Sequence, residues 1–211
     1  MTEYYVPTGS GAAEIVEKRS RFIGHIWRIS SEDEARRYVS EMKSKYYDAR
    51  HNCWCCIVRD GGTLRYSDDG EPQGTAGQPM LEMFQRSGVT DVCCVVTRYF
   101  GGILLGTGGL LRAYTQAAKL ALEDAGLSVV RLWECVTVLC DYNLFERVKL
   151  EISATSGIVT NTDYSDKVLI DAVVPEGASE KFFERMSDIS SGTAVCSLTG
   201  TEMRDVPLTL K

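Results

Sequence analysis

Apolar and polar positions alternate along the first half of the chain in a rhythm typical of strands. A period of two, with β-branched and aromatic residues, predicts strands over residues 51–59 and 63–67, joined by a glycine-containing turn at 60–62. Residues 14–29 alternate in the same way and predict either one long strand or a hairpin. Residues 92–96 are continuously apolar, which is typical of a strand buried on both faces.

Three other stretches carry apolar residues at helical spacing, and each has its own start signal. A capping box opens a helix over residues 31–46. A proline suited to the first helical turn opens a second helix over residues 79–87. A third helix starts after Gly109 and ends at Gly126.

After Gly126 the pattern changes to strand, helix, strand, strand, helix, strand. The successive ranges are about 129–142, 144–153, 157–164, 167–174, 178–189 and 193–201. This β-α-β-β-α-β order is the ferredoxin-like arrangement. The sequence therefore predicts an α+β protein of two domains, residues 1–131 and a ferredoxin-like domain of residues 132–211.

The most unusual stretch, residues 91–114, joins a buried strand to the third helix through a glycine-dense loop. Backbone N–H groups at such a junction attract anions. The candidate anion-binding residues are Arg98, Gly101, Gly102, Gly106, Thr107, Gly108, Gly109 and Arg112. The P-loop pattern fails because Thr107 stands where lysine is required, and the dinucleotide pattern fails because Leu111 replaces its third glycine. Anion binding and a tight loop built only for close packing therefore stay open as alternatives.

A second shaped loop, residues 68–81, carries the carboxylates Asp68, Asp69 and Glu71 among glycines and prolines. Three roles suit these carboxylates: binding a hard cation, acid–base chemistry, or pairing with Arg98 and Arg112. Pairing is the interpretation we adopt as the resting arrangement. Arg112 is expected in the first turn of a helix, where the helix dipole disfavours a cation unless a negative partner lies close by.

Composition and charge exclude several classes of protein. The net charge of the 211 residues is −6, and residues 132–211 carry all of it, because acidic and basic residues are equal in number over 1–131. A generally basic nucleic-acid-binding surface is therefore excluded, although a local basic patch is not. No apolar run approaches the length of a membrane span, and the N-terminus lacks the features of an export signal. We expect a cytoplasmic protein without a membrane partner, whose eight cysteines are reduced thiols.

His51, Cys53 and Cys55 share one face of a predicted strand, which suggests a metal site or a thiol nucleophile beside a histidine. Zinc usually takes four ligands, and no second close pair is present because Cys93 and Cys94 point to opposite faces of their strand. A thiol nucleophile also needs a third, orienting group. Buried thiols without chemistry are the favoured interpretation. We expect no metal and no other cofactor, and nothing here identifies an enzyme.

Four segments of the chain match a known family. They are Ser20–Ile23, His51–Trp54, Asp68–Leu81 (DDGEPQGTAGQPML) and Thr97–Tyr114 (TRYFGGILLGTGGLLRAY). Through them the chain resembles the IMPACT/YigZ family in its short bacterial-type form. The last two segments are long and unusual in composition, which makes the match specific. All four lie within the first 130 residues, and the rest fits the small second domain of bacterial members.

The resemblance implies a first domain with the ribosomal protein S5 domain 2-like fold and a second domain similar to the last domain of translocation elongation factors. Eukaryotic relatives regulate translation during amino-acid starvation and carry an additional N-terminal RWD domain. We expect this chain to lack that domain, because its first strand is predicted near residue 14. For the short members the resemblance implies a role in translation or nucleic-acid binding, with RNA or a ribosome-associated protein as partner.

Three functions follow as hypotheses. The first is a translation-associated binding module, whose nucleic-acid candidates are Arg21, Arg98, Tyr99, Phe100, Arg112 and Lys119. The second is an enzyme or binder acting on a phosphorylated small molecule, with the glycine loop on phosphate and Asp68, Asp69 and Glu71 on Mg²⁺. The third is a protein–protein interaction module that uses the acidic second half.

Overall fold

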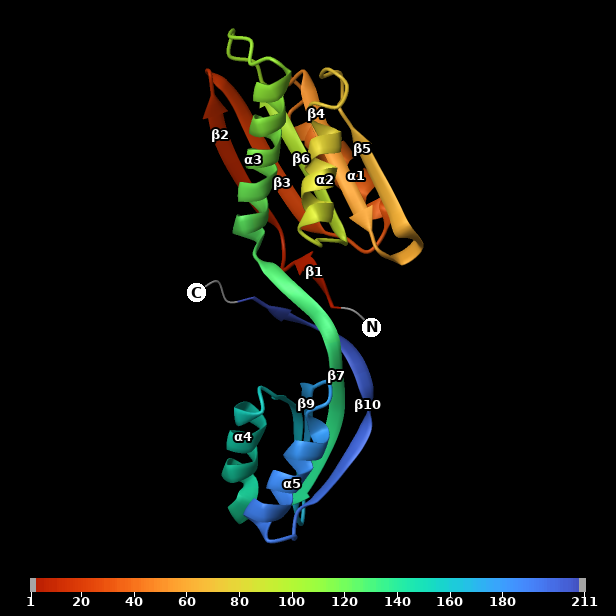
Figure 1. Ribbon diagram of the computed structural model, residues 1–211, viewed down its shortest axis with the longest axis vertical. Coiled ribbons are helices and arrows are strands. Elements are labelled where there is room, and N and C mark those ends of the chain that lie inside the picture. Colours follow the sequence, from red (N-terminus) through yellow and green to blue (C-terminus); the bar gives the residue numbers. More distant parts are fainter. Residues whose placement is uncertain (1–2, 209–211) are drawn as a thin grey trace. The chain divides into compact units, whose positions relative to one another are not determined.

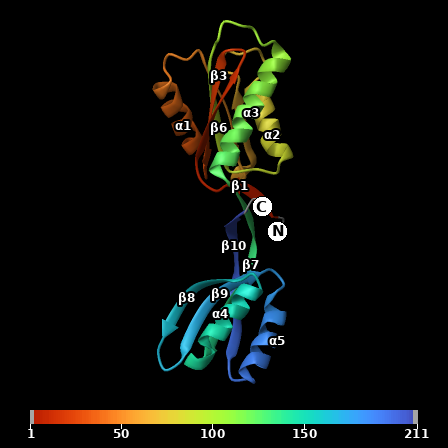
Figure 2. The same cartoon turned by 90° about the vertical axis from the view of Figure 1, so that its left-hand side faces the viewer.

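The computed structural model describes residues 3–208 as two compact units (Figures 1 and 2). One unit contains residues 4–129 together with 206–208, and the other contains Glu3 with residues 130–205. The outermost residues of the two predicted domains, 1–2 and 209–211, lie outside the described range. Each unit has its own helices and its own hydrophobic core.

The first unit is built on a five-stranded antiparallel sheet in the order β2-β3-β6-β4-β5. Its strands are β2 (Gly11–Glu17), β3 (Ser20–Arg28), β4 (His51–Val58), β5 (Thr63–Ser67) and β6 (Val92–Tyr99). Residues 14–29 form a hairpin rather than one strand, because Lys18 and Arg19 turn the chain with φ of 46° and 64°. A further strand, β1 (Tyr4–Pro7), precedes the sheet, so the first strand begins earlier than the expected residue 14.

Helices cover both faces of this sheet (Figures 1 and 2). They are α1 (Glu32–Lys45), α2 (Gly77–Arg86) and α3 (Thr107–Ala125). Successive residues of β6 alternate between two cores: Cys94 and Val96 face α2 and α3, whereas Cys93 and Val95 face α1. Burial on both faces explains why this strand is apolar without interruption.

The second unit has the β-α-β-β-α-β order expected from the sequence. Its elements are β7 (Leu127–Cys140), α4 (Phe145–Ala154), β8 (Ile158–Tyr164), β9 (Val168–Pro175), α5 (Ser179–Ser190) and β10 (Val195–Pro207). The five-stranded sheet has the order β1-β7-β9-β8, β10 also pairs with β7, and β9 is antiparallel to both β7 and β8. Helices α4 and α5 pack on one face of the sheet, over the buried side chains of Val138 and Ile170. The predicted α+β fold class, with a ferredoxin-like second part, is confirmed.

Candidate functional site

Three connecting segments of the first unit meet at one end of its sheet. They are the β2–β3 turn (Lys18–Arg19), the acidic loop between β5 and α2 (residues 68–76) and the glycine loop between β6 and α3 (residues 100–106). Antiparallel pairing brings them together, since it sets the start of β4 beside the end of β6, with His51 opposite Arg98. Most of the predicted site residues therefore lie at one place.

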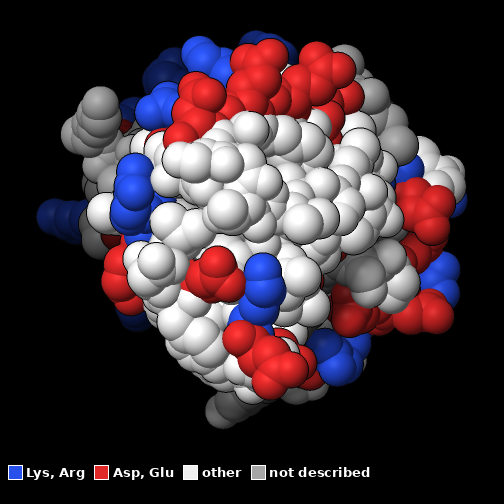
Figure 3. All heavy atoms as spheres, turned by 90° about the horizontal axis from the view of Figure 1, so that it is seen from below, with Lys and Arg blue, Asp and Glu red and all other residues white. Residues whose placement is uncertain are grey.

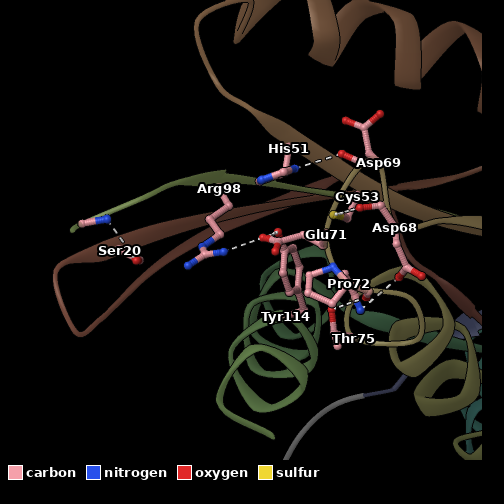
Figure 4. A network of polar contacts seen from close by, with 12 residues as sticks. Ser20, His51, Cys53, Asp68, Asp69, Glu71, Pro72, Thr75, Arg98 and Tyr114 are labelled. Carbon is pink, nitrogen blue, oxygen red and sulfur yellow. Dashed lines mark hydrogen bonds and ion pairs between the residues drawn. The ribbon is translucent and has the colours of Figure 1, made fainter. Parts of the chain in front are cut away.

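A buried polar network occupies the space between these segments (Figure 4). Arg98 Nη1 donates to Glu71 Oε1 at 2.6 Å, and the Tyr114 hydroxyl donates to the same oxygen at 2.8 Å. The side chains of Arg98 and Glu71 are only 7% and 3% exposed. Burial raises the pKa of the Tyr114 phenol, so its hydroxyl stays protonated as a donor. The structure thus brings Arg98 together with one of the three predicted carboxylates.

The guanidinium of Arg98 is surrounded by aromatic rings but is not fully hydrogen-bonded. Its Cζ atom lies 5.4 Å from the centre of the Phe22 ring and 5.5 Å from that of Phe100. Arg98 Nε is buried and has no hydrogen-bond partner among the described residues. A buried arginine with an unused donor is unusual, because nearly all buried polar atoms in proteins are paired.

Asp68 has a structural role, since it caps the start of α2. Its two carboxylate oxygens accept the backbone N–H groups of Gly74 at 2.8 Å, Ala76 at 3.1 Å and Gly77 at 2.8 Å. These donors would otherwise be orphaned at the end of the acidic loop and the first turn of the helix. The carboxylate therefore holds the acidic loop in shape.

Asp69 points to the other face of the sheet from Glu71. Its carboxylate accepts from Lys43 Nζ of α1 at 2.6 Å and from the backbone N–H of Asn52 at 2.7 Å. A φ of 43° at Asp69 turns the chain between the carboxylates and separates their directions. The three carboxylates do not face one anion-binding loop together, as the sequence had suggested, but have separate partners.

The third helix begins earlier than predicted, and this changes the position of Arg112. Helix α3 starts at Thr107, after Gly106 with φ of 72°, so Gly108 and Gly109 form part of its first turn. Arg112 consequently lies in the second turn. Its side chain is exposed and makes no ion pair or hydrogen bond within residues 3–208. The predicted pairing of Arg112 with the acidic loop is wrong, because those carboxylates already have other partners.

Two further cations at this end were not among the predicted site residues. Lys18 and Arg19 are exposed, and neither has an ion-pair partner in the part of the chain that the structure describes. The backbone of Arg19 contacts the glycine loop at Gly101, and Arg112 lines a groove along α3 together with Glu17 of the same hairpin. We call Lys18, Arg19 and Arg112 the basic rim. The hairpin alternative for residues 14–29 was the sequence signal that could have placed this turn beside the loop.

The other nucleic-acid candidates differ in whether their side chains are free to contact a ligand. Three already have acidic partners: Arg21 with Glu14 at 2.9 Å, Tyr99 with Asp48 at 2.6 Å, and Lys119 with Glu123 at 3.8 Å. Phe100 is 50% exposed and Leu104 is 82% exposed, both in the glycine loop. The exposed apolar groups of this end therefore lie next to its unpaired cations.

Gly101 provides a test of how the loop is held. A Cβ added there would lie 2.0 to 2.4 Å from backbone atoms of Arg19 and Ser20. We expect Gly101→Ala to lower the free energy of unfolding by about 1–3 kcal/mol, because backbone must move to make room. Urea denaturation measures this loss. Gly9→Ala is the matched control, since no atom lies within 4 Å of an added Cβ there; equal losses in both variants would contradict the expectation.

The cysteines and histidines do not form a reactive centre in the described part of the chain. Burial raises the pKa of the Cys53 and Cys55 thiols, so neither is a thiolate near neutral pH. His51 Nδ1 donates to the backbone oxygen of Asp69 at 2.9 Å. Among residues 3–208, no group of three His, Cys, Asp or Glu side chains is placed to hold a metal ion.

None of the helices within the described range combines the length and the apolar character needed to cross a membrane.

Comparison with known proteins identifies relatives of both units. The sequence profile of the Impact N-terminal domain matches residues 18–122, and that of a domain of unknown function (DUF1949) matches residues 138–193. The chain is 35% identical over 190 residues to the IMPACT family member YvyE of Bacillus subtilis, covering 90% of this chain and 88% of the relative. It is 33% identical over 196 residues to the IMPACT family member YigZ of Escherichia coli, covering 92% and 96%.

More distant and structural relatives agree with this result. Protein IMPACT of Rattus norvegicus is 28% identical over 105 residues, which cover 48% of this chain and 33% of the rat protein. A solved structure described as a crystal structure of an hypothetical protein matches with a TM-score of 0.58 and 32% identity, covering 94% of this chain and 98% of its own. The match to bacterial relatives thus spans both units, whereas the match to the rat protein spans about half of this chain.

Proposed function

The chain belongs to the IMPACT family, and from this premise we propose that it is a translation-associated binding protein whose first unit binds RNA at the glycine-loop end. The RNA phosphates would contact the basic rim and the amino end of α3. Exposed bases would stack on Phe100. No chemical reaction is part of this proposal.

The observation that carries the proposal is the basic rim beside an uncapped helix. Lys18, Arg19 and Arg112 have no acidic partners within the described chain. Helix α3 has 19 residues, and Gly106 supplies no side-chain cap for its first N–H groups. Unpaired cations and free N–H groups at a helix start both favour a bound anion. An exposed aromatic ring next to them suits a base of a single strand.

The acidic loop supports RNA binding over phosphate binding with Mg²⁺, because its carboxylates already accept hydrogen bonds from the protein. Each of Asp68, Asp69 and Glu71 accepts hydrogen bonds from groups of the first unit itself. They are therefore not arranged to hold Mg²⁺ beside a phosphate, which the second hypothesis requires.

The face of the molecule drawn in Figure 3 is not predominantly basic. That face has a broad uncharged centre, and acidic side chains gather along one edge of it. Phosphates would be repelled by such an edge. The uneven charge of the chain thus favours an RNA site on the first unit.

The test is a fluorescence-anisotropy titration of a short single-stranded RNA at several salt concentrations. The variant Lys18→Asn/Arg19→Asn/Arg112→Gln removes the basic rim, and asparagine tolerates the positive φ of the turn. We expect at least about tenfold weaker binding and a salt slope reduced by about 2, since each lost contact with a single-strand phosphate removes about 0.7.

The matched control is Arg36→Gln/Arg37→Gln/Arg86→Gln, which removes three exposed charges from α1 and α2. Its affinity should stay within about threefold of wild type, because loss of distant charges acts only through screened fields. The proposal fails if wild type does not bind RNA at low salt, or if both triple variants lose affinity equally.

A further inference from the structure

One edge of the Arg98 guanidinium, formed by Nε and Nη2, has no hydrogen-bond acceptor among the described residues. Its Nη1 is used by Glu71, but its Nε has no partner, and no described residue accepts a hydrogen bond from its Nη2. The side chain is 93% buried, given its exposed fraction of 7%. In Figure 4 the terminal nitrogen that does not bind Glu71 points away from that carboxylate, to the side on which Ser20 lies.

The Nε and Nη2 atoms of an arginine form a planar fork that matches two oxygens of one phosphate or carboxylate group. Leaving the Nε donor buried and unpaired is unfavourable, and no described protein group relieves it. Glu71 contacts the guanidinium at Nη1, and the hydrogen bond from Tyr114 holds its carboxylate in that position. The same carboxylate therefore cannot also accept from Nε and Nη2. The free fork is therefore oriented, and an external oxyanion could reach it once the Phe100 ring moves away from the guanidinium.

We propose that this fork binds a terminal phosphate monoester, and that in RNA it recognises the 5′-phosphate end of the strand. This inference rests on the proposed RNA binding and specifies which part of the RNA is held. An internal phosphodiester has chain on both sides and does not fit a donor that is 93% buried. A terminal phosphate has one substituent and three free oxygens, so it can approach a recessed donor end-on.

The surroundings suit the charge of a monoester. Arg98 and Glu71 together are neutral, so the second negative charge of the phosphate needs further cations. The basic rim supplies them at the same end of the sheet, from the β2–β3 turn and the second turn of α3. A carboxylate, with one charge and two oxygens, would use the fork but leave the rim unused.

The glycine loop is built to let such a group in. Phe100 lies over the guanidinium and is half exposed, so its ring can swing aside without leaving a buried core. Gly102 and Gly106, with φ of 82° and 72°, flank the apolar residues Ile103 and Leu104, which are 42% and 82% exposed. These side chains would gain burial if the loop closed over a ligand.

The experiment compares 5′-phosphorylated RNA with a 5′-hydroxyl RNA one nucleotide longer, whose charge is closely similar. Wild type should bind the phosphorylated strand about tenfold more tightly or better, as expected for two charge-assisted hydrogen bonds. Arg98→Lys keeps a cation near Glu71 but removes the fork. In this variant, shown to be folded by circular dichroism, the preference should fall to about one, while the affinity and salt slope for the 5′-hydroxyl RNA stay unchanged.

A second measurement needs no variant and applies if Arg98→Lys does not fold. The Nε–H signal of Arg98 in ¹⁵N-labelled wild type should shift when 5′-phosphorylated RNA is added, and not when 5′-hydroxyl RNA is added. A nucleoside 5′-monophosphate in place of RNA tests whether a free mononucleotide is sufficient.

The outcomes separate the two proposals. Salt-dependent RNA binding without a 5′-phosphate preference, or with an unmoved Arg98 Nε signal, overturns the terminal-phosphate inference and leaves RNA binding intact. A shifted Nε signal with the mononucleotide and no RNA binding overturns the proposed function, and supports the fork as a site for a small phosphate monoester.

Discussion

Replacing Glu71 with alanine should lower the free energy of unfolding by about 3–5 kcal/mol, because it leaves the Arg98 guanidinium buried without a counter-charge. The pair is almost completely buried, and Glu71 Oε1 also accepts the Tyr114 hydroxyl, so two donors lose their acceptor together. Urea denaturation followed by circular dichroism measures the loss.

Glu14→Ala is the matched control, since Glu14 also forms a bidentate pair with an arginine, Arg21, but at the surface. There we expect a loss of about 1 kcal/mol or less, because exposed ion pairs contribute little. The double replacement Glu71→Leu/Arg98→Met should be much more stable than Glu71→Ala, because it removes both buried charges. If Glu71→Ala costs no more than Glu14→Ala, the network does not stabilise the fold as argued.

The second large effect is expected at Asp68. Asp68→Ala removes the acceptor of three backbone N–H groups, two of which belong to the buried residues Ala76 and Gly77. Since hydrogen bonds to a charged group contribute about 1.5–3 kcal/mol each and are not additive, we expect a loss of about 3–5 kcal/mol. Thermal and urea unfolding both report it.

A milder substitution tests whether the loss of stability comes from the hydrogen bonds by which Asp68 caps α2. Asp68→Asn keeps Oδ1, which accepts from Ala76 and Gly77, and loses only the oxygen bonded to Gly74. It should cost about 1–2 kcal/mol. Asp33→Ala, at a side chain that is 90% exposed, should cost less than about 0.5 kcal/mol. An Asp68→Asn protein as unstable as Asp68→Ala would show that charge, rather than the three hydrogen bonds, matters there.

The elements of the fold follow from short-range patterns, which is why most of them could be predicted. The continuous apolar run in β6 indicated burial on both faces, and the two cores on either side of Cys93 and Cys94 agree with it. The start of α3 could not be predicted in the same way. Gly108 and Gly109 are poor helix formers, yet they lie in the helix because Gly106 makes the turn before it.

The hydrogen-bond partners of the site residues depend on tertiary structure and were harder to predict from the sequence. The spacing of the acidic residues suggested one cluster, but the φ of 43° at Asp69 sends that side chain toward α1 and Glu71 toward α3. Tyr114 lies within the third helix predicted from the sequence, and its side chain is buried. The acceptor of its hydroxyl, 43 residues earlier in the chain, has no signature in the local sequence.

The sequence separations within the Arg98–Glu71–Tyr114 network determine when this network can form during synthesis of the chain. The two hydrogen-bond donors to Glu71 follow it in the sequence, Arg98 by 27 residues and Tyr114 by 43 residues. They lie on opposite sides of the glycine loop. A growing chain that ends before α3 therefore holds a carboxylate and a guanidinium that cannot yet be buried together under a helix. The surface proposed to bind RNA can therefore form only after α3 has been synthesised and has packed on the sheet.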